Sequence, residues 1–320
     1  METQKILKLS SISKKIVVAL LGGFLLFFLL FHMVANLCIL RNDGGEWYRA
    51  FCHFMTNPFI KVMEIVLMAA LLFHIILTVS LWIYNKTHAR PINYKHASKT
   101  KTATGSKLMM WTGIVIFLFL GLHFCNFYFA KFDLVPGTYL VETENLSKEL
   151  NELQNNMTPQ MENTMANLQV IASEFRSEED FDAFLNKSNP SADEMDVINF
   201  LKFQKVLDNA QGNVEQGGKY ITNLSREDKK VIKNILPKLH VEPDFFYMAR
   251  DLFKNVLYLV IYLLCFVALW FHMRHAFESA FQTLGLNNYK YNKAIIIASQ
   301  IYASLICLGF AIVPIAVFFF

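Results

Sequence analysis

The chain has 320 residues, of which 54% are hydrophobic and 18% charged, and its formal net charge is +4 at pH 7. This hydrophobic share, with a mean hydropathy of +0.32, excludes an ordinary water-soluble domain and indicates an integral membrane protein. No nucleic-acid partner is expected.

Five apolar segments without charged residues are each long enough to cross the roughly 30 Å hydrocarbon core of a bilayer as a helix. In chain order they cover residues 16–40, 66–84, 108–130, 255–273 and 294–320. Isolated strands would leave backbone groups unsatisfied in lipid, so all five are predicted to be helices. Lys14 and Lys15 before the first segment raise the alternative of a signal peptide. The apolar run is too long for one and lacks a cleavage site, so a retained helix is expected.

Charge is segregated along the chain. Residues 131–248 contain 20 Asp and Glu against 12 Lys and Arg, whereas the rest of the chain contains 18 basic and 6 acidic residues. Basic residues cluster before the first span, between the second and third, and between the fourth and fifth: Lys5, Lys8, Lys14, Lys15, Lys86, Arg90, Lys95, Lys99, Lys101, Lys107, Lys290 and Lys293. The positive-inside rule makes these segments cytoplasmic, and it places the loop after the first span, the insert and the C-terminus outside.

The chain is therefore predicted to divide into residues 1–130 with three spans, an acidic insert at 131–249, and residues 250–320 with two spans. Helical stretches are expected in the insert around residues 146–168, 192–209 and 226–236. Ser225 with Asp228, and Ser191 with Glu194, have the spacing of capping boxes. The predicted fold class is an all-α integral membrane protein, with five transmembrane helices in a bundle and a mostly helical extracytoplasmic insert.

The five cysteines form neither a CxxC pair nor a CxxCH motif. This spacing argues against a covalently attached haem and against an iron–sulfur cluster on this chain. Free thiols among apolar neighbours are expected, with a bond between Cys38 and Cys52 as the alternative.

Four histidines lie inside the apolar spans, one on each of four predicted helices: His32, His74, His123 and His272. An ionisable side chain in a bilayer is costly, so such residues indicate a functional site. Four imidazoles are the ligands of two bis-histidine haems, and paired ligation favours electron transfer over oxygen binding. The alternative is four histidines that bind backbone or water in a transporter or channel.

The direction of each span gives the height of its histidine above the cytoplasmic side. His32 lies about 24 Å up and His123 about 22 Å up, whereas His74 lies about 15 Å up, at 1.5 Å per residue. His272 lies near the cytoplasmic end of its span. The heights predict two pairs, His32 with His123 and His74 with His272.

Other residues extend this candidate site. His275, one helical turn after His272, is the alternative fourth ligand, and otherwise it is expected to face a haem propionate or a quinone headgroup. Arg274 is a candidate for binding propionates, anionic lipid or a docked partner. Small surfaces where a flat macrocycle or a helix can approach closely are supplied by Gly22, Gly23, Gly113 and Gly121.

Short motifs in both membrane portions resemble the cytochrome b membrane-anchor subunit of the succinate dehydrogenase/fumarate reductase family, in its single-chain, five-helix, two-haem form. The resemblance covers roughly residues 10–130 and 250–320. The motifs are Phe31-His32-Met33-Val34-Ala35-Asn36, His53-Phe54-Met55 with Pro58-Phe59, Leu72-Phe73-His74, Pro91-Ile92-Asn93-Tyr94, Leu122-His123, Phe271-His272 and the stretch from His275-Ala276-Phe277 to Leu284-Gly285.

The resemblance implies two haems b, with His74 and His272 proximal to the soluble subunits and His32 and His123 distal. It also implies a flavoprotein subunit and an iron–sulfur subunit at the cytoplasmic face of a bacterial inner membrane, and menaquinone or a similar quinone in the bilayer. Glu64, near the outer end of the second span, is then a candidate for exchanging quinone protons. The alternative for Glu64 is a solvated carboxylate that stabilises its helix start.

The insert departs from the family pattern, in which short loops are more usual, and its role is left open. No GxGxxG fingerprint occurs in the chain, so the dicarboxylate chemistry is expected on a partner subunit. The sequence leaves two alternatives to this function. One is a cytochrome b anchor of another dehydrogenase, such as a hydrogenase or formate dehydrogenase. The other is a non-redox transporter or sensor with an extracytoplasmic ligand domain.

Overall fold

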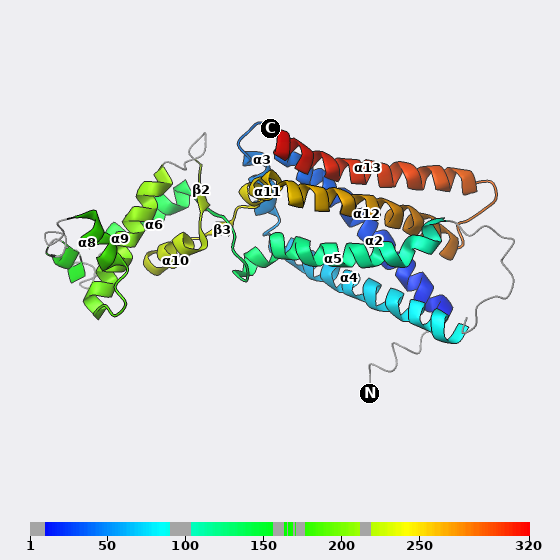
Figure 1. The fold of residues 1–320 in the computed structure, drawn as a ribbon, viewed down its shortest axis with the longest axis horizontal. Helices are drawn as coiled ribbons and strands as arrows, with labels where there is room; N and C mark the ends of the chain where they lie inside the picture. Colours follow the sequence, from blue (N-terminus) through cyan, green and yellow to red (C-terminus); the bar gives the residue numbers. More distant parts are fainter. Residues whose placement is uncertain are drawn as a thin grey trace. The chain divides into compact units, whose positions relative to one another are not determined.

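The computed structural model describes residues 10–89, 104–155, 163–164, 166–168, 170, 177–211 and 219–320. The chain forms two compact units, drawn in Figure 1. The first comprises Met1–His123 with Ala249–Phe320 and is called the membrane unit below. The second comprises Phe124–Met248 and is called the insert unit.

Five long apolar helices build the membrane unit, and each is long and apolar enough to cross a membrane. They are α2 (Ser11–Leu37), α4 (Pro58–Tyr84), α5 (Thr104–Asn126), α12 (Val256–Thr283) and α13 (Asn292–Phe319). The helices run alongside one another in alternating directions (Figure 1). The chain is therefore a predominantly helical, multi-pass membrane protein that lies in a lipid bilayer, as its composition predicts.

Shorter elements border these helices: η1 (Cys38–Leu40), α3 (Glu46–Phe54), the π-helical turn η2 (Asn85–Ala89) and α11 (Phe245–Lys254). We call the end of the bundle at which residues 284–291 join α12 to α13 the loop end. The described part of the chain contains all five cysteines as free thiols, so Cys38 and Cys52 form no bond.

All five helices extend beyond their predicted spans at one end, and α4 and α12 extend furthest. α4 begins at Pro58 rather than at residue 66, because the Asn57 side chain accepts a hydrogen bond from the backbone N–H of Phe59 and proline suits the first turn. α12 continues past residue 273 to Thr283 and includes Arg274 and Glu278. The charge-free window marks the apolar part of each helix but not the end of its backbone hydrogen bonding.

Hydrogen bonds from polar side chains connect neighbouring membrane helices. Trp270 Nε1 on α12 donates to Ser304 Oγ on α13 at 3.0 Å, and the Tyr302 hydroxyl on α13 donates to the Leu26 carbonyl on α2 at 2.6 Å. Hydrogen bonds of this kind and close packing at small residues stabilise helix contacts in lipid. At Gly309 on α13, a Cβ atom would lie 2.5 Å from the sulfur of buried Met33 on α2. Glycine is therefore needed where α13 passes α2.

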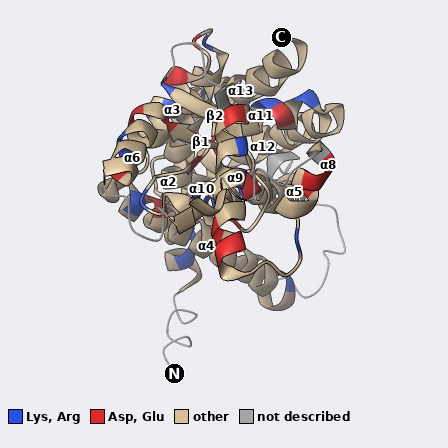
Figure 2. Cartoon of the chain, turned by 90° about the vertical axis from the view of Figure 1, so that its left-hand side faces the viewer, with Lys and Arg blue, Asp and Glu red and all other residues tan. Residues whose placement is uncertain are grey.

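The insert unit is mostly helical, as predicted, and it also contains a small antiparallel sheet that the sequence did not predict. Besides η3 (Tyr128–Phe132), its elements are α6 (Thr143–Asn155), α8 (Glu178–Leu185), α9 (Ala192–Gln211), α10 (Arg226–Ile235), β1 (Tyr139–Glu142), β2 (Tyr220–Leu224) and β3 (Glu242–Pro243). The strand order is β2-β1-β3, with Tyr139 opposite Leu224 on one side and Pro243 on the other. Figure 2 marks the positions of acidic and basic residues along the chain, in red and blue.

The core of the insert unit lies between the sheet and the helices α6, α9 and α10. Its buried members include Tyr139, Val141, Phe203, Ile232 and Leu236. Strands of four and five residues are marginal alone, so burial of their apolar side chains against helices accounts for their stability.

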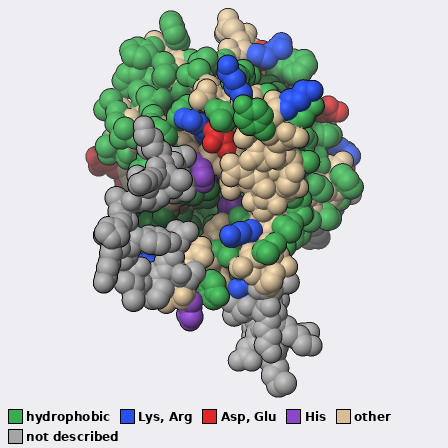
Figure 3. Space-filling model, turned by 90° about the vertical axis from the view of Figure 1, so that its right-hand side faces the viewer, with side chains coloured by type: hydrophobic (Ala, Val, Ile, Leu, Met, Phe, Trp, Pro, Cys, Tyr) green, Lys and Arg blue, Asp and Glu red, His purple; other side chains and the backbone are tan. Residues whose placement is uncertain are grey.

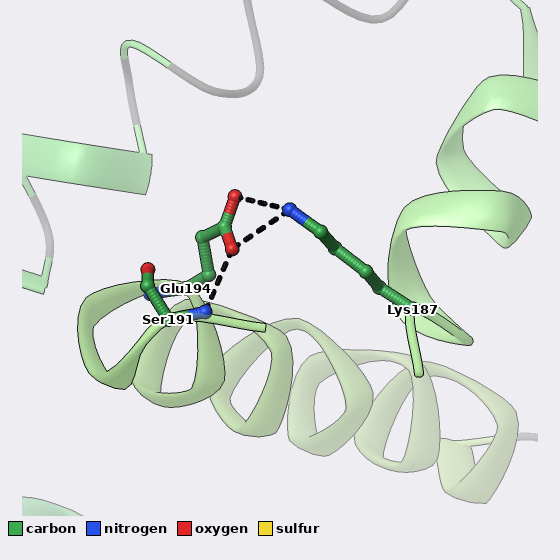
Figure 4. Close-up of polar contacts among 3 residues, drawn as sticks. All are labelled: Lys187, Ser191 and Glu194. Atoms are coloured by element: carbon green, nitrogen blue, oxygen red, sulfur yellow. Dashed lines mark hydrogen bonds and ion pairs between the residues drawn. The ribbon is translucent and has the colours of Figure 1, made fainter. Parts of the chain in front are cut away.

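Both predicted capping boxes are confirmed. In α10, Ser225 N donates to Asp228 Oδ2 at 2.8 Å, and Asp228 N donates to Ser225 Oγ at 3.1 Å. At the start of α9, Ser191 N donates to Glu194 Oε2 at 2.9 Å, and Glu194 N donates to Ser191 Oγ at 3.3 Å. Lys187 Nζ contacts both oxygens of Glu194, at 2.8 and 2.9 Å (Figure 4).

Asp133, Tyr139 and Lys229 form a polar cluster in the insert unit, and they come from the end of η3, from β1 and from α10. Asp133 has a left-handed backbone, with φ 55°, and its Oδ1 accepts the Tyr139 hydroxyl at 2.7 Å. Lys229 Nζ donates to both carboxylate oxygens of Asp133, at 2.7 and 2.8 Å, and lies 4.5 Å from the centre of the Tyr139 ring. Burial, helped by the bond to Asp133, raises the pKa of Tyr139 to about 12. Burial opposes ionisation of Asp133, but the bonds from Lys229 and Tyr139 outweigh it and lower the pKa of that carboxyl.

Candidate functional site

The four intramembrane histidines come from four different helices. His32 lies on α2, His74 on α4, His123 on α5 and His272 on α12, and each side chain is half-buried. The structure places them at two levels of the bundle. We call His32 and His123 the upper pair, and His74 and His272, which lie nearer the loop end, the lower pair.

The imidazoles of the upper pair face one another across the bundle. Their ring centres are 6.0 Å apart and their planes are nearly perpendicular, at 83°. Aromatic side chains surround them. Phe28 stacks on His32 at 5.3 Å, Phe310 of α13 lies 5.6 Å from it, and Phe119 lies 5.9 Å from His123. The Asn36 side-chain amide is the polar neighbour of His32, with its Nδ2 3.4 Å from His32 Nδ1, so the surroundings of the upper pair are mainly aromatic with one amide beside them.

The lower pair is packed against glycines on neighbouring helices. A Cβ atom at Gly22 of α2 would lie 3.6 Å from His74 Cε1, and a Cβ atom at Gly113 of α5 would lie 3.6 Å from His272 Cε1. His74 and His272 are close enough for the charge of one to act on the other. Among the described residues, His74 Nδ1 is buried and makes no hydrogen bond.

His272 lies next to a threonine hydroxyl. Thr112 Oγ1 is 3.3 Å from His272 Nδ1, and the same hydroxyl is 3.1 Å from the Leu108 and Met109 carbonyls. When the hydroxyl donates its proton to one of these carbonyls, its oxygen can accept a proton on Nδ1. In that tautomer the lone pair of the histidine lies on Nε2, as in a metal ligand.

The helices α2 and α5 carry the same spacing of small residue and histidine. Gly22 precedes His32, and Gly113 precedes His123, by ten residues in each case. Ten residues of α-helix correspond to about 15 Å. Each of the two helices thus presents a glycine at the level of the lower pair and an imidazole at the level of the upper pair.

The separation of the upper pair can be compared with that of two imidazoles on one haem iron. A metal–imidazole nitrogen bond is about 2 Å long and the ring centre lies roughly 1 Å further on, so two rings on one iron have centres about 6 Å apart. The upper pair has this separation. The described residues contain no group of three or more His, Cys, Asp or Glu side chains that could hold a metal ion, whereas axial haem ligation needs only two.

The other predicted site residues lie at different places in the membrane unit. Arg274 Nε donates to Glu278 Oε1 at 3.2 Å, and its guanidinium is 5.6 Å from the Trp270 ring. His275 is half-buried, and the charges of Glu278 and Arg274 lie close enough to act on its ring. Glu64 is half-buried on α4, ten residues before His74, and therefore about 15 Å nearer the level of the upper pair. The Pro91-Ile92-Asn93-Tyr94 motif lies outside the described residues.

Sequence reasoning missed Glu278 and Ser299. Ser299 on α13 is fully buried, and its hydroxyl donates to Glu278 Oε1 on α12 at 3.0 Å. The sequence did contain a signal for Glu278. No glycine or proline lies between the apolar span that ends at residue 273 and Glu278, so the helix could be expected to continue to this acidic residue. Figure 3 looks onto the loop end, where histidine side chains are visible in a hollow bordered by basic and acidic groups.

Comparison of the chain with protein-family models, with curated proteins and with solved structures gives no match. The fold and composition define a multi-pass helical membrane protein.

Proposed function

We propose that this chain is a dihaem cytochrome b that anchors a succinate:quinone or quinol:fumarate oxidoreductase and passes electrons between its iron–sulfur subunit and membrane quinone. The observation that carries the proposal is the placement of four intramembrane histidines at two levels, two at each, with the rings of His32 and His123 facing one another. The ordered motifs shared with the anchor subunits of that family support the choice of enzyme.

The protein's own residues would act by holding and burying the two groups. His32 and His123 would hold one haem, and His74 and His272 would hold the other. Bound haem supplies one-electron chemistry. Two levels about 15 Å apart along α2 and α5 would let electrons cross much of a roughly 30 Å bilayer core.

The remaining parts of the enzyme would come from partners. A flavoprotein subunit and an iron–sulfur subunit would dock at the cytoplasmic face of a bacterial inner membrane. The basic residues of the loop end, such as Lys290 and Lys293, support this orientation. The insert would then be extracytoplasmic.

Haem content tests the proposal directly. We expect the purified chain to show a b-type α-band in a reduced-minus-oxidised spectrum and about two haems per chain by pyridine haemochrome assay. A folded preparation without haem would contradict every cytochrome assignment and favour a transporter or sensor. Copurification of flavoprotein and iron–sulfur subunits distinguishes the proposed enzyme from the anchor of another dehydrogenase.

The glycines behind the lower pair provide a matched test of packing. In Gly22→Leu, the side chain extends beyond a Cβ that is already 3.6 Å from His74, so the lower site should lose its haem and the upper site should keep its own. Gly23→Leu, at the neighbouring position with nothing within 4 Å, should retain both. Haem per chain measures the difference, and equal loss in both variants would count against the placement of the lower site.

The choice between His272 and His275 can be settled by single replacements. His272 contacts the Thr112 hydroxyl, which can accept a proton on Nδ1 and leave Nε2 free to bind a metal, whereas His275 lies one turn along near the charged groups of Glu278 and Arg274. We expect His272→Ala to remove one haem and His275→Ala to retain two, as counted by pyridine haemochrome assay. Loss of a haem only in His275→Ala would reverse the assignment.

A further inference from the structure

The chain leaves α5 through a cluster of aromatic side chains. Phe124, in the last turn of α5, has its ring centre 5.4 Å from that of Tyr128 and 6.2 Å from that of Phe129. The ring centre of Tyr128 in turn lies 5.5 Å from that of Phe132. The cluster therefore begins on a helix that is apolar enough to cross a membrane and continues through η3 into the insert unit.

Two large apolar side chains at the end of this cluster are exposed. Phe132 is 57% exposed and Leu134 is 69% exposed. In the described part of the insert unit, the other exposed side chains of this kind are Val170 and Met195, which lie much further along the chain. Exposed apolar side chains that lie together indicate a surface that another molecule covers.

The turn that carries Phe132 and Leu134 is fixed to the insert unit. Asp133, between them, has the left-handed backbone, and its carboxylate accepts two hydrogen bonds from Lys229 on α10. The backbone N–H of Leu134 donates to the Phe129 carbonyl at 3.1 Å and closes the turn. Because Asp133 is held by α10, its two neighbours are kept at the surface.

The place of this turn along the chain indicates what covers it. Phe132 follows the last residue of α5 by six residues, and η3 rises about 2 Å per residue, so Phe132 lies on the order of 12 Å from the end of the span. The polar interface on either side of the hydrocarbon core is about 5–8 Å thick, and aromatic side chains are enriched there. Exposed Lys131, with Nζ 5.4 Å from the ring centre of Tyr128, brings a positive charge to the depth of the lipid phosphates.

We propose that Tyr128, Lys131, Phe132 and Leu134, called the η3 patch below, form a lipid-binding surface that enters the bilayer interface at the end of α5 and docks the insert unit on the membrane. The surface is continuous with the lipid-facing side of a span, which favours lipid over a protein partner. Residues 131–248 contain more acidic than basic side chains, so burial of apolar area supplies the attraction rather than net charge. This docking is independent of haem binding.

Contact with lipid can be measured on the full chain in phosphatidylcholine nanodiscs. Fluorine is introduced as 4-fluorophenylalanine in place of Phe132, and in a matched control in place of Met195, which is exposed on α9. Dissolved oxygen concentrates in lipid, whereas a nickel chelate stays in water, and both relax a nearby fluorine nucleus. We expect strong relaxation by oxygen and weak relaxation by nickel at position 132, and the reverse at position 195.

Removal of one apolar side chain provides the second measurement. With the probe at position 132, Leu134→Ser should raise relaxation by nickel about tenfold, because burial of a leucine side chain favours contact with lipid by at least that factor. Met195→Ser should leave the same signal unchanged, and since both side chains are exposed, neither change removes a core contact.

Three results would overturn the proposal. One is strong relaxation by nickel at position 132 in the chain with Leu134 intact, which would place the η3 patch in water. Another is protection of position 132 from both oxygen and nickel, which would mean that a protein chain covers the patch. The third is the same relaxation by nickel with and without Leu134→Ser.

Discussion

Alanine at His32 or at His123 should each remove one of two low-spin haems, and alanine at both positions should remove no more than either change alone. The two imidazoles of the upper pair, whose ring centres are 6.0 Å apart, would bind the same iron. Because one replacement already removes that low-spin haem, the second replacement has no further haem to remove. His74→Ala and His272→Ala should behave in the same way at the lower level. Low-spin haem per chain, measured from the reduced α-band and by electron paramagnetic resonance, gives the count.

Double replacements across the two pairs separate pairing from general damage. His32→Ala combined with His74→Ala should remove both low-spin haems, because each change disables a different level. Non-additivity within pairs and additivity between them is the signature of two independent sites. If His32→Ala with His74→Ala kept one low-spin haem while His32→Ala with His123→Ala kept none, the pairing would be wrong.

Asp133→Ala should destabilise the insert unit by about 2 kcal/mol. Tyr139 is fully buried, so its hydroxyl would lose its acceptor without gaining water, and an unsatisfied buried donor costs about 1–3 kcal/mol. The ion pair with Lys229 contributes less, since the Asp133 side chain is 39% exposed and solvent screens it. Hydrogen–deuterium exchange in β1 and β2 of the full chain measures the change. Glu227→Ala, which removes an exposed pair with Lys230 on α10, is the control and should have little effect.

The same cluster sets the sign of the pH dependence. Asp133 has a lowered pKa in the folded protein, so its contribution is present above the usual carboxyl pKa of about 4 and is lost as pH falls through the folded value. Tyr139 has its pKa raised to about 12, so its contribution is complete below about 10 and is lost as pH rises through 12. Relative to wild type at each pH, Asp133→Asn should cost least in acid and Tyr139→Phe should cost least in alkali. A constant difference across the range would contradict this account.

The membrane helices and their histidines could be predicted because their signals are local. Length and hydropathy define a span, and counting residues along helices of alternating direction grouped His32 with His123 and His74 with His272. The predicted height of His272 was wrong, because α12 continues to Thr283 and His272 lies eleven residues before its end rather than near it. The capping boxes at Ser191 and Ser225 were equally local, since each depends on a pair of residues three apart.

The sheet and the contact between Glu278 and Ser299 could not be predicted, because both depend on contacts between segments on different elements. β1 has four residues and β3 has two, which is too short for an alternating pattern to emerge. The role of Glu278 depends on Ser299, which lies on the next helix, and on the continuation of α12 past residue 273. A charge at the end of an apolar run marks a span boundary in one protein and a polar site inside a longer helix in another.

Pairing of β1 with β3 has an evolutionary consequence. The insert unit covers Phe124–Met248, and within it Tyr139 of the first strand lies opposite Pro243 of the last strand. The first and last strands of the unit are therefore neighbours, as the ends of a chain often are in domains that tolerate insertion into a host protein. A segment whose first and last strands pair with each other can be acquired, exchanged or deleted between α5 and α12 while the histidine-bearing helices keep their order.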